Sequence, residues 1–292
     1  MKDKICVVTG ASSGIGYGVA LSLSVMNSVP VLLSRDNQRG RETYRKLHRI
    51  NGNVEWLPAD LSSQRSVREF AEQFSLRYGK CNVLFNCAGV QKMQKVVSED
   101  GLEMMFATNY LGHFLLTNLL FDALRTASES KVITTTGSSH KASAVEGRNV
   151  GRINLQDLQA ETDFNFSNQS KQVVLSKILF TYELSRRWKN YDIAVCTLSP
   201  GLVKTNLVSR LPWYVRAYFD LRCALMRAQT PEGAARHYID LATREDINGK
   251  YFEADSGQLV ETRSSDESYD KNIARKLWNA SETLVGQCFD YR

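Results

Sequence analysis

Residues 4–16 read KICVVTGASSGIG, and this stretch decides the fold. A β-branched, apolar run ends at Thr9, and Gly10, Gly14 and Gly16 follow it. Glycine has no Cβ, so backbone amides can approach a pyrophosphate, and the N-terminus of a following helix favours the negative charge. A glycine motif is informative when it joins a strand to a helix, and here it directly follows a predicted strand. The stretch therefore predicts a strand–turn–helix unit that binds a dinucleotide.

The rest of the chain continues the alternation of strands and helices. Short apolar runs such as VPVLLSR (29–35), CNVLFNCAG (81–89) and DIAVCTLSPG (192–201) alternate with amphipathic helical stretches. This pattern predicts an α/β fold: a doubly wound sheet of about seven parallel strands in a single domain, residues 1–292. Residues 141–166 and 209–230 form two long irregular insertions, and long loops in such folds are usually functional.

Composition narrows the class of protein. The 292 residues, 43% of them hydrophobic, can bury one large core. The net charge of +6 comes from scattered basic residues, which predicts no nucleic-acid partner and suits an anionic cofactor or membrane surface. The six cysteines form no CxxC pair or Cys/His cluster, so we expect reduced thiols and no metal. With no signal peptide and no membrane-spanning run expected, the sequence favours a cytoplasmic protein, with contact to a lipid surface left open.

Further motifs fall at the ends of later predicted strands. They are the Asp60-Leu61 pair, NCAG at 86–89, Asn109 in TNYLGHF, and Pro200-Gly201 followed by Thr205. Together with TGASSGIG they resemble the short-chain dehydrogenase/reductase family over nearly the whole chain. Near the end, TPEGA, GKYF and ARKLWNASETLVG resemble its retinol-dehydrogenase-like branch. The resemblance implies a Rossmann fold and NAD(P)-dependent chemistry on a lipophilic carbonyl or alcohol.

The resemblance also implies a set of cofactor contacts. These are Gly10, Ser12, Ser13, Gly14 and Ile15 at the phosphates, with Gly16 completing the turn; Asp60 and Leu61 at the adenine; Asn86, Ala88 and Gly89 at the adenosine ribose side; and Pro200, Gly201, Val203 and Thr205 at the nicotinamide. In the family an acidic residue closing the second strand selects NAD, whereas an arginine can bind the extra phosphate of NADP. Arg35 takes that place and favours NADP. NAD stays open, because Asp36 could bind ribose hydroxyls.

The catalytic motif of the family is damaged. Its members use a tyrosine, a lysine four residues later, a serine after the fifth strand and an asparagine. Reading without a gap from SKILFTYELSRRW and from GRINLQDLQAE places the tyrosine at Ser170 and the lysine at Val174. Val174 carries no charge, and the hydroxyl of Ser170 is shorter and less acidic than a phenol. A rival register keeps Lys171 as the lysine, but it needs three extra residues within a helix and puts Ser167 at the tyrosine position.

The remaining catalytic positions leave alternatives. The ungapped match puts Gly137 at the serine position, and a one-residue bulge would bring Ser138 there; a turn-capping role fits Ser138 equally. Asn109 matches the family's asparagine, although helix packing would explain it too. His113 and His140 are replacement acids by chemistry, and structural roles fit both.

LPWYVRAYFDLRCALM, residues 211–226, lies within a predicted substrate-cover segment at about 207–230. Its aromatic residues suit a small lipophilic substrate, and its arginines suit anionic headgroups. The alternative is a helix pair packed on the edge of the sheet. Three functions remain open: an oxidoreductase with an unorthodox proton donor, a nucleotide-binding pseudoenzyme acting as sensor or scaffold, and a peripheral lipid-surface protein. The intact cofactor motifs weigh against the third, and a homo-oligomer stays open.

Overall fold

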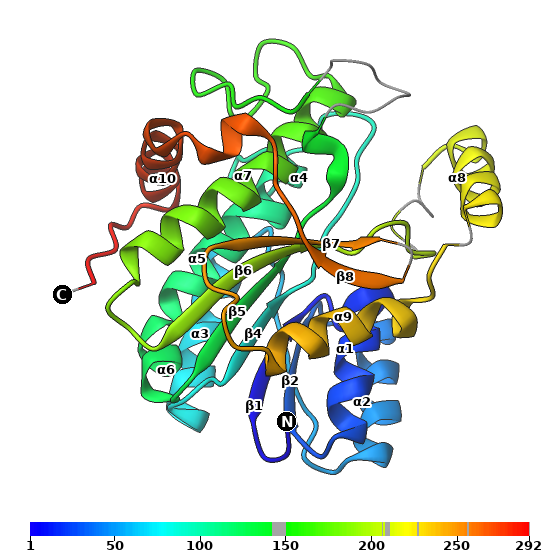
Figure 1. Ribbon diagram of the computed structural model, residues 1–292, viewed down its shortest axis with the longest axis vertical. Helices are drawn as coiled ribbons and strands as arrows, with labels where there is room; N and C mark the ends of the chain where they lie inside the picture. The colour runs from blue at the N-terminus through cyan, green and yellow to red at the C-terminus, as the bar shows by residue number, and fades with distance from the viewer. Residues whose placement is uncertain (142–149, 206, 208–210, 227, 256, 292) are drawn as a thin grey trace.

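The computed structural model describes residues 1–141, 150–205, 207, 211–226, 228–255 and 257–291. Its centre is an eight-stranded sheet with the strand order β3-β2-β1-β4-β5-β6-β7-β8. Figure 1 shows this sheet between two layers of helices. Every neighbouring pair is parallel except β7 and β8, which are antiparallel. The predicted doubly wound sheet is confirmed. The count of about seven strands left out β8, because its four residues are mostly exposed and show no apolar alternation.

The strands are β1 (Ile5–Thr9), β2 (Val29–Ser34), β3 (Glu55–Pro58), β4 (Val83–Asn86), β5 (Ser130–Thr135), β6 (Ile193–Ser199), β7 (Lys250–Asp255) and β8 (Gln258–Glu261). The helices are α1 (Gly14–Val25), α2 (Gln38–Ile50), α3 (Gln64–Tyr78), α4 (Met104–Phe106), α5 (Gly112–Leu119), α6 (Phe121–Thr126), α7 (Phe166–Arg187), α8 (Trp213–Leu225), α9 (Pro231–Thr243) and α10 (Lys271–Val285). A π-helical turn, η1 (Ala107–Leu111), joins α4 to α5, and a 3-10 turn, η2 (Ser138–His140), follows β5.

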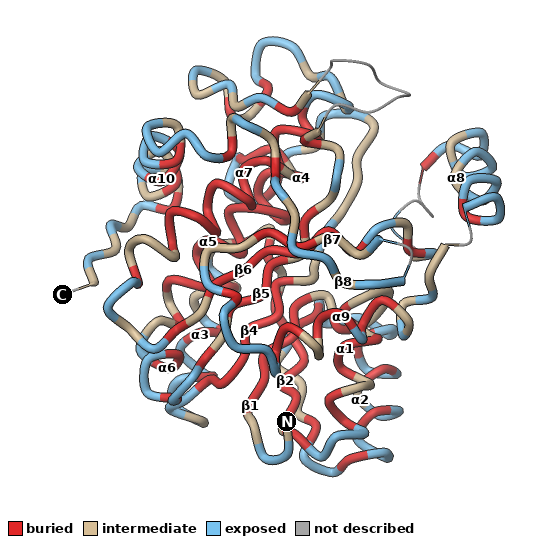
Figure 2. The backbone as a smooth tube through the Cα atoms, in the orientation of Figure 1, coloured by how far each residue is buried: buried red, intermediate tan, exposed pale blue. Residues whose placement is uncertain are grey.

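The sheet separates two apolar cores. On one face, aromatic residues of α3, α5, α7 and α10 pack together, among them Phe74, Phe114 and Trp278. On the other face, α1, α2 and α9 contribute residues such as Leu23 and Tyr238. Figure 2 shows that the central strands are buried along their length, as expected of parallel strands covered on both faces.

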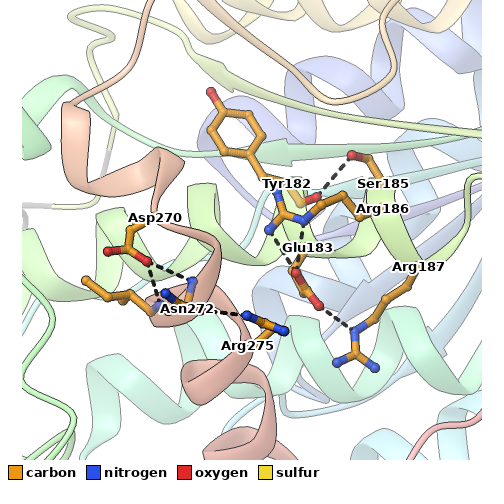
Figure 3. Close-up of polar contacts among 9 residues, drawn as sticks. Tyr182, Glu183, Ser185, Arg186, Arg187, Asp270, Asn272 and Arg275 are labelled. Carbon is orange, nitrogen blue, oxygen red and sulfur yellow. Dashed lines mark hydrogen bonds and ion pairs between the residues drawn. The ribbon is translucent and has the colours of Figure 1, made fainter.

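The C-terminal helix α10 is held on α7 by packing and charge. Glu183 of α7 is almost completely buried, and its carboxylate accepts hydrogen bonds from Arg186 and Arg187, as Figure 3 shows. The guanidinium of Arg187 also lies 4.1 Å from the ring centroid of Trp278 on α10. The carboxylate of Glu183 thus positions Arg187, and Arg187 joins α7 to α10.

The second insertion differs from the prediction. Residues 213–225 form a regular helix, α8, whereas we expected an irregular segment or a packed helix pair. Figure 1 shows α8 standing apart from the sheet, and only Cys223 of this helix is buried. Of the first insertion, residues 142–149 lie outside the described residues. No helix in the described part of the chain is both long and apolar enough to cross a membrane.

Candidate active site

The strand order reverses between β1 and β4. Open α/β sheets bind ligands at the carboxyl ends of the strands beside such a reversal, and we refer to this region as the crevice. Gly10 has φ +66°, and a Cβ atom built on it would lie 2.8 Å from Cα of Ala88. A Cβ on Gly16 would lie 2.5 Å from the carbonyl oxygen of Gly10. Only glycine fits both places, so the turn after β1 packs against the segment after β4 and against the start of α1.

The N-terminus of α1 opens into this crevice. Ser13 is the N-cap residue in an extended conformation, and its side chain makes no capping bond. Gly14 has φ +55°, and a Cβ on it would lie 3.3 Å from Cγ2 of Thr205. The structure therefore brings the glycine turn, with Ser12 and Ile15 half-buried within it, next to the segment that follows β6.

Contacts with Ala254 and Gln229 fix the segment that follows β6. Gly201 has φ +71°, and a Cβ on it would lie 2.9 Å from the carbonyl oxygen of Ala254. Gln229 donates from Nε2 to the carbonyl of Pro200 at 3.2 Å, and Val203 pairs with Gln229 in a parallel bridge. These contacts give the chain between residues 200 and 205 a fixed course along the crevice.

A hydroxyl and an imidazole join the ends of β1 and β4. Oγ1 of Thr9 accepts the N–H groups of Cys87 at 2.8 Å and Ala88 at 3.0 Å, and lies 3.0 Å from Nε2 of His113. Burial, and after it the nearby charge of Lys177, lower the pKa of His113 to about 3. His113 is therefore neutral at pH 7, where it acts as a structural link and cannot supply a proton as an imidazolium.

A cavity of about 480 Å³ lies beyond the ends of β2 and β3, where the adenosine side of a cofactor was expected. It is lined by Arg35, Asp36, Asn37, Pro58, Ala59, Asp60 and Ser66. The carboxylate of Asp36 pairs with Arg41 at 2.8 Å, and that of Asp60 accepts from Oγ of Ser62 at 2.7 Å. Within the described residues Arg35 forms no ion pair, so its guanidinium is the cation that this cavity offers to a ligand.

Two of the expected adenosine-side residues are buried. Asn86 is completely buried, and its Nδ2 donates to Oγ1 of Thr117 at 3.0 Å, which ties β4 to α5. Its side chain is therefore enclosed between β4 and α5, whereas Ala88 is half-buried and Gly89 is exposed. Leu61 is also buried, and its carbonyl faces Gly112, where no side chain would fit.

The positions expected for serine and lysine face each other. A Cβ built on Gly137 would lie 3.8 Å from Cγ2 of Val174, and Ser170 is half-buried one turn earlier on α7. Ser138 instead begins η2 and is exposed, so no bulge brings it opposite Val174. Lys171 is almost completely buried and lines a separate cavity of about 590 Å³ against the insertion before α7. The structure thus places Val174, and not Lys171, opposite Gly137.

Asn109 and His140 have structural contacts. Oδ1 of Asn109 accepts from the N–H of Val90 at 2.7 Å, and its Nδ2 donates to the carbonyl of Val90 at 2.9 Å. Both ends of this amide are therefore used to hold the chain after β4. His140 is fully buried, its Nδ1 lies 2.8 Å from the carbonyl of Gly137, and burial lowers its pKa to about 4. Like His113, it is neutral at pH 7.

One charged residue in this region was missed by motif reasoning. Lys177 of α7 is only 7% exposed, and its Nζ donates to the carbonyl of Thr135 at 2.8 Å, at the end of β5. The signal in the sequence was a single lysine within the apolar run LSKILF. Among the described residues, no group of His, Cys, Asp and Glu side chains could hold a metal ion.

Comparisons with known proteins agree with this geometry. Residues 4–148 match the family model of the short chain dehydrogenases. Retinol dehydrogenase 14 of Mus musculus is 33% identical to this chain, over 98% of this chain and 87% of that protein. The chain belongs to the short-chain dehydrogenase/reductase family. Polyprenol dehydrogenase of Homo sapiens is 29% identical over 97% of this chain and 86% of its own length.

Solved structures have the same fold as this short-chain dehydrogenase/reductase. The crystal structure of an uncharacterized protein from Mycobacterium Paratuberculosis has a TM-score of 0.78 and 27% identity, covering 99% of this chain and 96% of that one. L-sorbose reductase from Gluconobacter frateurii, complexed with NADPH and L-sorbose, has a TM-score of 0.68 at 19% identity, covering 88% of this chain and 97% of that one, which shows the fold alone. Family and branch are thus those expected from the motifs.

Proposed function

We propose that this short-chain dehydrogenase/reductase binds NADP(H) and acts slowly on a lipophilic carbonyl or alcohol. The observation that carries the proposal is the crevice itself, in which the glycine turn, the N-terminus of α1 and a cavity containing Arg35 follow one another. Relatives named retinol dehydrogenase and polyprenol dehydrogenase support a lipophilic substrate.

The residues present fit a nicotinamide dinucleotide. Gly10 and Gly14 let the turn pack closely against Ala88 and Thr205, and the N-terminus of α1, which has no side-chain cap, suits the negative charge of a pyrophosphate. Arg35 suits the 2′-phosphate of NADP, because a guanidinium binds phosphate with paired N–H donors. Asp36 is already paired with Arg41, so its carboxylate is less available for the ribose hydroxyls of NAD.

The rate of reaction at this site is limited by the lack of a good proton donor. A bound nicotinamide would supply or accept the hydride. At positions 170 and 174 the chain offers a serine hydroxyl and an isopropyl group, neither of which is a good acid near pH 7. The loss of general acid catalysis typically costs about 10²- to 10⁴-fold in rate. Orientation of the reactants in a fixed crevice still favours transfer, so we expect slow turnover.

The second candidate is a nucleotide-binding pseudoenzyme that acts as a sensor or scaffold. The observation that favours it is the same facing pair, because Gly137 and Val174 offer neither hydroxyl nor ammonium to a carbonyl oxygen. Its cofactor site would be that of the first candidate, and only turnover distinguishes the two.

We propose in addition that α8 touches a lipid surface. Tyr214, Tyr218, Leu221 and Leu225 are 57%, 52%, 56% and 74% exposed, and their spacing of four, three and four places them on one helical face. Arg222 on the same helix adds positive charge for anionic headgroups. An exposed amphipathic helix of this kind suits a protein whose substrate arrives from a membrane.

Calorimetric titration with NADPH and NADH tests the cofactor claim. We expect the wild-type protein to prefer NADPH, and Arg35→Ala to lose that preference. Arg39→Ala is the matched control, because this exposed arginine on α2 does not line the cavity. Equal affinities in the wild type, or an unchanged preference in Arg35→Ala, would contradict the claim. Single-turnover oxidation of NADPH with a panel of retinal-like and short aldehydes then separates slow enzyme from pseudoenzyme.

A further inference from the structure

Lys177 is a buried cation without a counter-ion. The residue is 7% exposed, and within the described residues its ammonium forms one hydrogen bond, to the carbonyl of Thr135, and no ion pair. An ammonium has three N–H donors, so two are left without an acceptor among those residues. Taking a charge out of water costs several kcal/mol unless a partner compensates for it. A buried lysine of this kind indicates a ligand that supplies the missing acceptors.

The ammonium lies where the strands end. Thr135 is the last residue of β5, and Cys87 directly follows β4. His113 of α5 lies 3.0 Å from Oγ1 of Thr9, the same oxygen that accepts the N–H of Cys87. The charge of Lys177 lowers the pKa of both Cys87 and His113, which places it within electrostatic reach of these side chains. The carboxyl ends of parallel strands are where open α/β sheets bind their ligands. The cation therefore belongs to the floor of the crevice.

Lys177 also shares a helical face with the two positions that lack their expected side chains. Ser170, Val174 and Lys177 are spaced by four and three residues, so they lie above one another along α7. Three residues correspond to about 4.5 Å along a helix. Lysine has a long, flexible side chain. The ammonium of a lysine at position 177 can therefore reach the same part of the crevice as the ammonium of a lysine at position 174 would.

We propose that Lys177 binds the ribose next to the nicotinamide, its two remaining donors bonding the vicinal hydroxyls of that sugar. The inference rests on the proposed function, since it requires the nicotinamide half of the cofactor to lie over the ends of β4 and β5. Lys177 is then a positioning residue for the cofactor. It supplies the cation that Val174 does not, one turn further along the same helix.

The acid–base behaviour of this lysine agrees with the geometry. Burial lowers the pKa of Lys177 to about 8. A dinucleotide brings negative phosphates and hydroxyl acceptors, which favour the ammonium and raise that pKa again. Binding of NADPH above pH 8 should therefore take up a proton.

Two ligands and two variants test the proposal. NADPH contains the nicotinamide ribose, whereas 2′,5′-ADP contains only the adenosine end. In Lys177→Met we expect NADPH affinity to fall by about tenfold or more, the size of a lost charge-assisted hydrogen bond, while 2′,5′-ADP binds as in the wild type. Lys171→Met is the control, because this buried lysine of the same helix lines the separate cavity; it should bind both ligands normally.

The outcomes separate this inference from the proposed function. If the wild type binds no NADPH, the proposed function fails and this inference with it. If the wild type binds NADPH and Lys177→Met binds it equally well, only the inference is wrong, and Lys177 merely ties α7 to β5. Should Lys177→Met fail to fold, calorimetry of the wild type in two buffers at pH 8.5 decides. Proton uptake with NADPH but not with 2′,5′-ADP supports the proposal, and equal uptake with both overturns it.

Discussion

Gly137 and Val174 face each other between β5 and α7, with 3.8 Å between a Cβ built on Gly137 and Cγ2 of Val174. Next to this contact, Oγ1 of Thr136 donates a hydrogen bond to the carbonyl of Val174 at 3.1 Å. The helix is therefore fixed in register against the strand end. In this register Gly137 presents a hydrogen atom and Val174 an isopropyl group, and neither can donate a proton.

The glycine turn gives the first prediction. Gly10→Ala should lower the melting temperature and weaken NADPH binding, because its Cβ would lie 2.8 Å from Cα of Ala88 and φ is +66°. We expect a loss of more than about 1 kcal/mol in the free energy of unfolding. Gly52→Ala is the control, since no atom lies within 4 Å of its Cβ. Calorimetric melting and NADPH titration check both variants, and equal behaviour would contradict the packing described.

The two neutral histidines give the second prediction. His113 and His140 have folded pKa values of about 3 and about 4, lowered by burial, against about 6.5 in an unfolded chain. Below pH 6.5 the unfolded state binds more protons than the folded state, so stability falls as the pH falls. The loss is up to about 1.4 kcal/mol per pH unit for each histidine until its folded pKa is reached. Urea unfolding from pH 7 to pH 4.5 measures this slope.

His140→Phe should flatten part of that slope, because the remaining contribution comes from His113. The ring of His140 lies edge-on to Tyr251 at a centroid distance of 5.2 Å, so phenylalanine suits the site. A slope as steep as in the wild type would show that His140 is not the group that titrates.

Particular residues show how much of the fold and of the candidate site the sequence predicted. The sheet, the glycine turn and the family followed from local patterns, because strand periodicity and glycine spacing are local properties. The exposed strand β8 left no such pattern. The contacts that enclose Asn86 and Lys177 are also made with residues more than 30 positions away in the chain, Thr117 and Thr135, which no local pattern reports. For residues 209–230 the sequence predicted an irregular insertion, with a packed helix pair as the alternative, whereas the structure shows the helix α8 standing apart from the sheet.

The exposed face of α8 gives the third prediction. Leu221→Ser combined with Leu225→Ser should reduce binding to vesicles containing phosphatidylserine by about tenfold or more, because each leucine loses its apolar burial in the membrane. Leu76→Ser is the control, an equally exposed leucine (83%) on α3. Vesicle co-sedimentation at low and moderate salt measures the effect. If the double variant binds as well as Leu76→Ser does, α8 is not the membrane contact.

The fourth prediction concerns the missing acid. Ser170→Tyr with Val174→Lys places a phenol and an ammonium one helical turn apart, and the ammonium lowers the pKa of the phenol. Neither change alone should suffice, since one lacks its activating charge and the other lacks an acid to activate. We therefore expect strong non-additivity, with the double variant oxidising NADPH about 10²-fold faster than the parent in the presence of an aldehyde.

The double variant needs two further measurements. Val174→Lys puts a second ammonium one turn from Lys177, and burying it could cost a few kcal/mol, so melting curves must accompany the kinetics. Gly137→Ser should be tolerated as a third change, because Gly137 has an extended backbone (φ −147°, ψ 170°) and its Cβ would meet Val174 only at van der Waals distance. The hydroxyl would then face the new side chains. A parent already as fast as the triple variant would refute the missing acid, and a folded, NADPH-binding triple variant no faster than the parent would refute the placement of Ser170 and Val174 at the reacting end of the crevice.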